Sequence, residues 1–569
     1  MATQTSVRVP ARPPRLWKPA AGLRRSEAQR HALKAVVRQI RTCDPNSRRK
    51  YLREFNEAFR SYESVLSRAD FDSLIVSAGV VLLGDYHALA ASQKFAAEVI
   101  EHSKNSGRRL VLGLEMVFAR DQHIVDEWTA GEISDDELRE RIRFDVDWGY
   151  EWPPYLELLK TARDAGARIC GLDCMPRGDL RRIGARDRHA ATKIAELRAA
   201  DPEALIVVLF GESHLAPTHL PQEIHSSIPG ERVLTVLQNI DALYWLAAGE
   251  LRGNVEAVRV AKDIVCVFNA TPLEKYESYR LCIERWMREP AERPDFTVSV
   301  YNLVGALTRA MSIDSYSPHN GTQPHFLVDQ LPEIVVRSTA QAVRVLERKR
   351  LTPEEVAAAE EELSQGGMAY VESRNIILVT RWELSGAAEA VARFVHCACR
   401  GIPAEPADVA QQAPEDRFYS RVMEVALADF GARVLYPARP PAREADLYYL
   451  YGESRERIEE QSILSYPDYM RMIDFVIFHR DYQRNLRKYW EVPPLISEGR
   501  NFTGERFEFV TRKLGEMLGT ELYEGYISGV VKKRFIRSLL FRRLEKLGIA
   551  HVAYFAAVRR IRRRAPRVG

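Results

Sequence analysis

Two short apolar runs, each followed by Gly-x-x-His, constrain the fold of this chain more than any other feature. The first is VVLLGDYH at 80–87, and the second is IVVLFGESH at 206–214. Near-continuous runs of β-branched and aliphatic residues are typical of parallel strands that helices cover on both faces. Each run therefore predicts a buried strand that stops at a glycine and delivers an acid and a histidine just beyond its end.

Strand-like runs alternate with helical patterns between residues 76 and 270. Further strands are predicted at 109–114, 167–172, 232–237 and 263–268. Such alternation is typical of a parallel sheet whose crossovers are helices. The predicted fold class is α/β, with a mostly parallel sheet covered by helices.

Helical patterns flank this segment on both sides. Residues 1–22 are rich in proline and are predicted to be disordered, and 23–75 form an N-terminal helical segment. From 271 to 569 the pattern predicts a large, mostly α-helical C-terminal region. Its long helical stretches are predicted at 274–288, 352–365, 384–399, 418–430, 455–480 and 505–547.

Composition is that of an ordinary globular protein, with 46% hydrophobic and 28% charged residues and a net charge of +4. This charge gives no strong nucleic-acid signal. The N-terminus lacks a secretory signal pattern, and no apolar run is long enough to cross a membrane. Seven unevenly spaced cysteines argue against a disulfide framework. A cytoplasmic protein with reduced thiols is expected.

The carboxyl ends of parallel strands meet at one edge of a sheet, where ligands bind in α/β proteins. Six acid and histidine side chains fall near such predicted ends: Asp85, His87, Glu115, Asp173, Glu212 and His214. We therefore expect one composite pocket. The glycines at 84 and 211 are expected where each strand must turn sharply, since glycine tolerates the backbone angles and the close approach that such a turn requires.

Two chemistries suit this set of residues. A divalent metal bound by His87, Glu115, Glu212 and His214 would activate water or polarise a carbonyl group. Without a metal, His87 or His214 would act as a general base that Glu115 orients. The residue types leave both possibilities open.

The span from Val80 to Phe268 resembles the ChaN-like haem-binding uptake family of the wider Tiki/TraB and erythromycin-esterase-like superfamily. The resemblance rests on the two Gly-x-x-His motifs, the LEM step around Glu115, the WPPY helix start at 152–155 and GLDCMPR at 171–177. It covers about one third of the chain. The first motif departs from the usual Gly-Glu-x-His because it carries Asp85, which is one methylene shorter.

The resemblance implies a haem- or iron-binding protein whose small-molecule ligand contacts the six pocket residues. Other branches of the superfamily imply hydrolysis: Tiki-like members are metal-dependent peptidases, and esterase-like members open a lactone using a histidine. Haem or iron binding is the leading hypothesis. The alternative is a hydrolase of an ester, lactone or peptide bond, and a third hypothesis is an interaction scaffold with a vestigial site.

Three further features have both a structural and a functional interpretation. The aromatic segment 148–155 either stacks on a flat ligand such as a porphyrin or fixes its own loop against the sheet. His396, Cys397 and Cys399 lie on an apolar helix pattern that predicts burial. The basic tail 531–569 carries thirteen Lys or Arg against one acid, and is expected to contact an anionic membrane or to remain a solvated helix.

Overall fold

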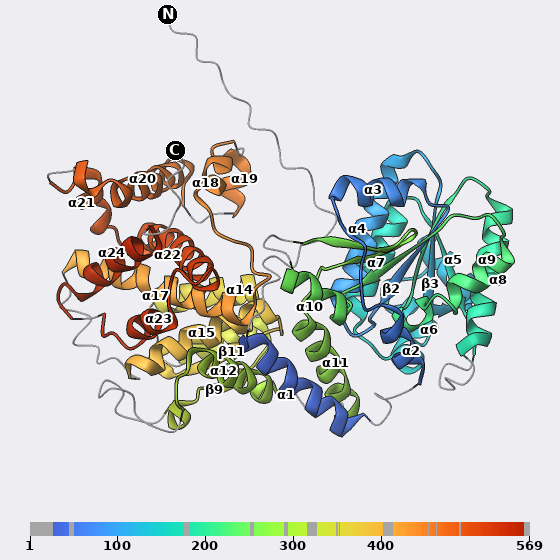
Figure 1. The fold of residues 1–569 in the computed structure, drawn as a ribbon, viewed down its shortest axis with the longest axis horizontal. Helices are drawn as coiled ribbons and strands as arrows, with labels where there is room; N and C mark the ends of the chain where they lie inside the picture. Colours follow the sequence, from blue (N-terminus) through green and yellow to red (C-terminus); the bar gives the residue numbers. More distant parts are fainter. Residues whose placement is uncertain are drawn as a thin grey trace, which may run out of the picture. The chain divides into compact units, whose positions relative to one another are not determined.

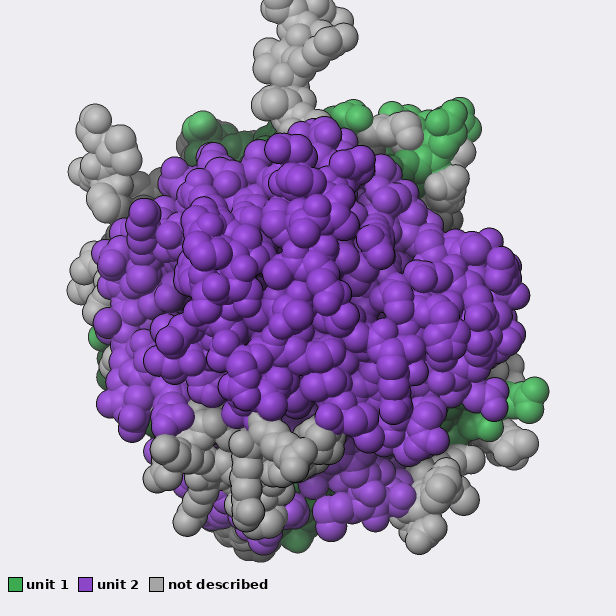
Figure 2. Space-filling view, turned by 90° about the vertical axis from the view of Figure 1, so that its right-hand side faces the viewer, with its two compact units in different colours: residues 1–13, 26–32, 293–569 green, residues 14–25, 33–292 purple. Residues whose placement is uncertain are grey.

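The computed structural model describes residues 27–44, 50–175, 183–250, 255–288, 294–315, 327–348, 351, 353–401, 413–452, 455–461, 464–488, 491–544 and 546–562. The predicted disorder of 1–22 and the last two residues of the 171–177 motif lie outside these ranges. The chain forms two compact units (Figure 1). The α/β unit is built mainly from Leu33–Glu292, purple in Figure 2, and the helical unit mainly from Arg293–Gly569.

An eight-stranded sheet forms the centre of the α/β unit, in the order β1-β7-β8-β6-β2-β5-β3-β4. The strands are β1 (Ser64–Leu66), β2 (Val80–Asp85), β3 (Leu110–Phe118), β4 (Arg168–Asp173), β5 (Leu205–Gly211), β6 (Val233–Gln238), β7 (Ala257–Ala261) and β8 (Ile264–Val267). The pairings from β8 to β4 are all parallel, whereas β7 pairs antiparallel with β1 and β8. The predicted mostly parallel α/β sheet is confirmed.

The two strands missed by the sequence pattern are β1 and β7. β1 has three residues, of which the first two are exposed, and β7 is only half buried. Neither has the continuous apolar run that identifies a strand covered on both faces. Both belong to the antiparallel end of the sheet, where such covering is not required.

Helices cover both faces of the sheet, since successive residues of one strand, such as Val81 and Leu82, are fully buried. α4 packs against α7, and α8 packs against α9 and β4. The helices of this unit are α1 (Glu27–Cys43, its first turn grouped with the other unit), α2 (Lys50–Ala58), α3 (Arg68–Ser77), α4 (Ala90–Ser103), α5 (Gln122–Thr129), α6 (Asp135–Arg141), α7 (Trp152–Asp164), α8 (Ile183–Ala200), α9 (Leu220–Ser227), α10 (Asp241–Glu250) and α11 (Pro272–Met287).

In the helical unit, α17 lies between α15 and α22, with which it makes the most extensive helix contacts. The helices are α12 (Thr297–Met311), α13 (Thr339–Arg348), α14 (Pro353–Gly366), α15 (Leu384–Arg400), α17 (Pro414–Leu435), α18 (Glu444–Leu450), α19 (Arg455–Gln461), α20 (Tyr466–Arg484), α21 (Pro494–Arg500), α22 (Gly504–Ile527), α23 (Lys533–Leu540) and α24 (Ile549–Arg562). A three-stranded sheet, unforeseen in the sequence, has the order β10-β11-β9. Its strands are β9 (Glu333–Val336), β10 (Met368–Val371) and β11 (Ile376–Val379).

Two predicted long helical stretches are interrupted. The stretch predicted at 505–547 ends its first helix at Ile527, and Gly529 adopts a left-handed φ of 76° before α23 begins. Glycine allows this conformation without a Cβ clash, so the chain turns there. The stretch predicted at 455–480 is likewise divided between α19 and α20.

Most of the described large apolar residues of the basic C-terminal segment belong to the core of the helical unit, while Leu547 and Val552 are exposed. Ile536, Leu539, Tyr554 and Phe555 are buried. His396 and Cys397 are buried as well, and all seven cysteines are free. Among the described residues, no helix has both the length and the apolar character needed to span a membrane.

Candidate functional site

Four adjacent parallel strands carry the predicted site residues to one edge of the sheet. In the order β2-β5-β3-β4, Asp85 ends β2, His214 follows β5, and Asp173 ends β4. The prediction that Glu115 ends its strand was wrong, because β3 continues to Phe118. The β3–β4 register shifts just after Leu114, and this irregularity lies at Glu115.

Two aspartate–histidine pairs flank the Glu115 carboxylate. His87 Nδ1 lies 2.8 Å from Asp85 Oδ2, and its Nε2 lies 3.9 Å from Glu115 Oε2. His214 Nδ1 lies 2.5 Å from Asp187 Oδ1, and its Nε2 lies 3.7 Å from Glu115 Oε1. Both imidazoles therefore direct Nε2 toward the same carboxylate, one toward each oxygen.

Glu115 is held by a buried arginine that the sequence-based prediction missed. Arg186 of α8 donates to Glu115 Oε1 at 2.5 Å, and to the two oxygens of Asp173 at 2.8 and 2.9 Å. The Gly211 N–H donates to Glu115 Oε2 at 2.5 Å. Burial alone would raise the pKa of Glu115, but Arg186 and the neighbouring histidines outweigh it and lower that pKa. Glu115 is therefore ionised at neutral pH.

Asp85 has its position fixed from three sides. Besides His87, it accepts hydrogen bonds from Gln93 Nε2 on α4, at 2.5 Å, and from the Tyr155 hydroxyl on α7, at 2.8 Å. Burial lowers the pKa of His87, but the charges of Asp85 and Glu115 outweigh burial, so the pKa lies above its usual value. The dyad thus raises the proton affinity of the imidazole.

His87 is the histidine of the site that reaches solvent. Its side chain is 21% exposed, against 4% for His214. Its ring lies 4.4 Å from the Trp148 ring and 5.1 Å from the Tyr150 ring, measured between centroids. A ligand that approaches this edge of the sheet therefore meets His87 before it meets His214.

Glu212 lies outside this network. Its carboxylate is 3.0 Å from Lys275 Nζ on α11, and the ammonium group also lies over the Tyr86 ring. Burial raises the pKa of Glu212, and Lys275 only partly opposes this rise. The acid that follows the glycine thus pairs with the histidine of its own motif in the first case, as Asp85 does with His87, and with Lys275 in the second.

The residues present do not form a cation site. Among the described residues, no group of three or more His, Cys, Asp or Glu side chains is arranged to hold a metal ion. The Arg186 guanidinium already neutralises Glu115, and its Nη1 lies 3.5 Å from His214 Nε2. The positive charge of Arg186 therefore lies between Glu115 and His214, where a metal ion bound by both residues would have to lie.

Several residues of the site were missed or given another role. Arg186 had no sequence signal, because a charged residue near the start of a helix normally faces solvent. Asp187 also lies on α8, away from the strand ends that were predicted to form the pocket, and Lys275 lies beyond that pocket as well. Arg186 and Asp187 can be assigned to the site only when the contact between α8 and the second Gly-x-x-His motif is known.

Gly211 acts through space and not through backbone angle. It has an ordinary φ of −48°, and Gly84 is absent from the positive-φ positions, so the prediction of unusual backbone angles was wrong. The close approach that was also predicted is found at Gly211. A Cβ on Gly211 would lie 3.0 Å from Glu115 Oε2 and 3.2 Å from His87 Nε2. The bare glycine leaves room for Glu115 and His87 to approach β5.

A cavity of about 620 Å³ lies beside the network, on the other side of Tyr150. The Tyr150 ring is 5.1 Å from His87 and 5.4 Å from Trp286, so it forms a wall between them. The lining residues are Arg139, Asp145, Gly149, Tyr150, Glu151, Trp152, Pro153, Arg285 and Trp286. The other aromatic rings of 148–155, Trp148 and Tyr155, are buried in the core.

Comparison with known families identifies the segment that carries most of this site. Residues 74–206 match a family model described as "Haem-binding uptake, Tiki superfamily, ChaN". These residues are a ChaN-like segment. The ChaN-like segment contains Asp85, His87, Glu115 and Asp173, and it ends before the second Gly-x-x-His motif.

Two solved structures are similar to parts of the chain. The first is described as "Cofacial heme binding to ChaN of Campylobacter jejuni": it is 14% identical, with a TM-score of 0.24, and the match covers 31% of this chain and 86% of that chain. The second is the type III effector HopBA1: it is 15% identical, with a TM-score of 0.29, and the match covers 37% of this chain and 98% of that chain. Both TM-scores are low, and neither likeness supports a conclusion about function. No curated protein matches the chain.

The two motif glycines provide a matched pair of variants. Gly211→Ala places a methyl group against Glu115 and His87, whereas a Cβ on Gly84 meets its nearest atoms at an ordinary 3.5 Å. We expect Gly211→Ala to shift the His87 ring signals in an NMR spectrum and to lower the melting temperature more than Gly84→Ala does. Equal effects of the two variants would contradict the spatial role of Gly211.

The Asp85–His87 pair predicts a pH dependence. Because the folded pKa of His87 is raised, its stabilising contribution is complete below the unfolded value of about 6.5 and is lost as the pH rises through the folded value. Asp85→Asn removes the charge and should lower the pKa of His87, as followed by its imidazole C–H resonance. The stability difference between wild type and variant should shrink with rising pH; a pH-independent difference would refute the pairing.

Proposed function

We propose that the ChaN-like unit binds haem in the cavity next to the Gly-x-x-His site. The observation that supports this proposal is the aromatic wall of the cavity, formed by Tyr150, Trp152 and Trp286. Flat aromatic ligands bind in concave apolar sites with a few polar groups that fix their orientation. A volume of about 620 Å³ suits a ligand of that kind.

The polar residues of the cavity fit the remaining chemistry of haem. Arg139 and Arg285 line the cavity, and guanidinium groups bind carboxylates such as the two propionates through charge-assisted hydrogen bonds. Tyr150 lines the cavity and would hold the haem iron, since tyrosine is a haem ligand in proteins. When bound, the group would supply a redox-active iron. The pocket residues predicted from the sequence would then act through the orientation of His87.

Titration of the purified full-length protein with hemin tests this proposal. We expect a saturable Soret shift relative to free hemin at micromolar concentration. Trp286→Ala should weaken binding at least tenfold because it removes one aromatic wall, and Trp286 is 47% exposed, so the variant should fold. Because Tyr150 would hold the iron, Tyr150→Phe should move the Soret band.

The matched control for Tyr150→Phe is Tyr448→Phe, because Tyr448 is an exposed tyrosine on α18 of the helical unit. It should bind hemin as wild type does. An unshifted Soret band, or a Trp286→Ala variant with wild-type affinity, would contradict haem binding in this cavity.

Metal-free hydrolysis is the second candidate function, because the two aspartate–histidine pairs have the orientation of general bases. In each pair a carboxylate holds Nδ1, so Nε2 is the nitrogen left to accept a proton, and in both rings it points toward Glu115. His87 is the base that a substrate reaches, and the Glu115 carboxylate would stabilise its imidazolium form. The Arg186 charge next to His214 disfavours the same role for that residue.

Assays with p-nitrophenyl esters and with simple lactones test this alternative. His87→Ala should abolish turnover, whereas His102→Ala, the same change on α4 away from the site, should leave it unchanged. Chelation with EDTA should have no effect, because the mechanism uses no metal. Rates equal to those of buffer, or full activity in His87→Ala, would eliminate hydrolysis at this site and leave the haem proposal untouched.

A further inference from the structure

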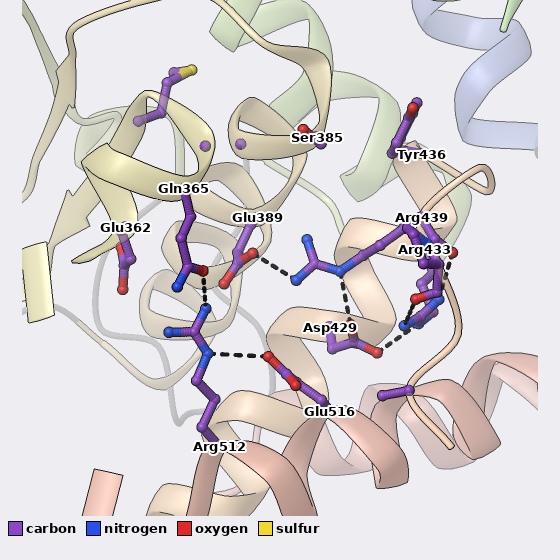
Figure 3. A pocket seen from close by; sticks show the side chains of 15 residues that line it. Glu362, Gln365, Ser385, Glu389, Asp429, Arg433, Tyr436, Arg439, Arg512 and Glu516 are labelled. Atoms are coloured by element: carbon purple, nitrogen blue, oxygen red, sulfur yellow. Dashed lines mark hydrogen bonds and ion pairs between the residues drawn. The ribbon is translucent and has the colours of Figure 1, made fainter. Parts of the chain in front are cut away.

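The helical unit contains a cavity of its own, of about 290 Å³, that plays no part in the Gly-x-x-His site. Six segments line it: α14, β10, α15, α17, α22 and the connection that follows α17 (Figure 3). Gly366 and Gly386 stand at its edge, where a Cβ on Gly386 would clash with the Gly366 carbonyl. This close approach of α14 and α15 leaves one wall without side chains. The volume is at the small end for ligand sites, which suits a metabolite smaller than a drug-sized molecule.

The charges around the cavity alternate in sign. Arg439 Nη2 lies 2.7 Å from Glu389 Oε2, and its Nε donates to Asp429 Oδ1 at 3.0 Å. Across the cavity, Arg512 Nε donates to Glu516 Oε1 at 3.0 Å, while its Nη1 and Nη2 donate to Glu361 and Gln365. Figure 3 shows the side chains of Glu389, Arg439, Glu516 and Arg512 around a common space, with Gln365 beside Arg512. Two guanidinium groups and two carboxylates therefore face one volume from different elements.

These ion pairs leave polar atoms available to a ligand. Glu389 uses one carboxylate oxygen on Arg439. Within the described part of the chain, Arg439 forms its side-chain hydrogen bonds and ion pairs through Nε and Nη2, which leaves Nη1 for a ligand. The side chains of Glu389, Arg439, Arg512 and Glu516 are between 17% and 28% exposed, so solvent reaches them. A carboxylate on a ligand can add to Arg439, and an ammonium group can add to Glu389 or Glu516.

The cavity also carries an excess of negative charge. Its lining contains four carboxylates, from Glu362, Glu389, Asp429 and Glu516, and three guanidinium groups, from Arg433, Arg439 and Arg512. Arg433 is fully engaged, by Asp429 and by the carbonyl groups of Arg439 and Pro440. A complementary ligand therefore carries one anionic group and two cationic groups, with a net charge of +1.

We propose that this cavity binds a free basic amino acid, whose α-carboxylate pairs with Arg439 and whose two cationic groups pair with Glu389, Glu516 and Glu362. A basic amino acid has the three charges in the required ratio, and it is small enough for the volume. Burial raises the pKa of Glu362, with Arg393 partly opposing it, so an added cation near that carboxylate is favourable. This inference is independent of haem binding and of hydrolysis, because it concerns residues of the helical unit alone.

Calorimetric titration of the full-length protein with three related compounds tests which charges of the ligand the cavity recognises. We expect L-arginine to bind saturably. Agmatine lacks the carboxylate and L-citrulline lacks the side-chain charge, so each should bind at least tenfold more weakly, a loss of about 1.4 kcal/mol or more. No saturation by L-arginine in the millimolar range, or equal binding of L-citrulline, would overturn the proposal.

Variants of α22 locate the binding site. Glu516→Gln keeps the shape of the side chain and removes its charge, and it should weaken L-arginine binding at least tenfold. Glu505→Gln is the matched control, because Glu505 is exposed on the same helix and outside the cavity lining; it should bind as wild type does. Wild-type affinity in Glu516→Gln would overturn the proposal. If circular dichroism shows that Glu516→Gln does not fold, the three probes on the wild-type protein decide the matter.

Discussion

The buried contact between Arg186 and Glu115 is the interaction on which the site depends. It joins α8 to β3, and through Asp173 and the Gly211 N–H it also engages β4 and β5. Loss of one partner from a buried ion pair leaves an uncompensated charge and typically costs about 3–5 kcal/mol. The carboxylate toward which both histidines point is therefore also a structural tie between three strands and a helix.

Much of the central sheet could be predicted from the sequence because its strands are buried on both faces. The runs at 80–83 and 206–210 have no polar residue to obscure them, and β2 and β5 proved to be neighbours in register. β1 and β7 escaped prediction because their burial is mixed. The three-stranded sheet escaped prediction because each of its strands has only four residues. Helix ends inside long helical patterns were also missed, because such breaks depend on tertiary packing.

The candidate site could be predicted only in part, and the reason is visible in the two motifs. Each has the same spacing, yet His87 takes its carboxylate from its own motif, whereas His214 takes Asp187 from a helix 27 positions earlier in the sequence. Glu212 turns instead to Lys275. The position of a residue relative to the end of its strand predicts whether its side chain reaches this edge of the sheet. The residues that it contacts there belong to helices, and the sequence of those helices does not distinguish such buried charged residues from solvent-exposed ones.

The position of Tyr150 has a thermodynamic consequence. This one ring contacts His87 on one side and lines the aromatic cavity on the other. A ligand that displaces the ring alters the surroundings of the imidazole, and protonation of the imidazole alters the wall that the ligand meets. Thermodynamic linkage makes such effects reciprocal. If an occupied cavity changes the free energy of proton binding at His87, protonation of His87 changes the free energy of ligand binding in the cavity by the same amount. The two halves of the site then form one coupled equilibrium, joined through a single aromatic side chain.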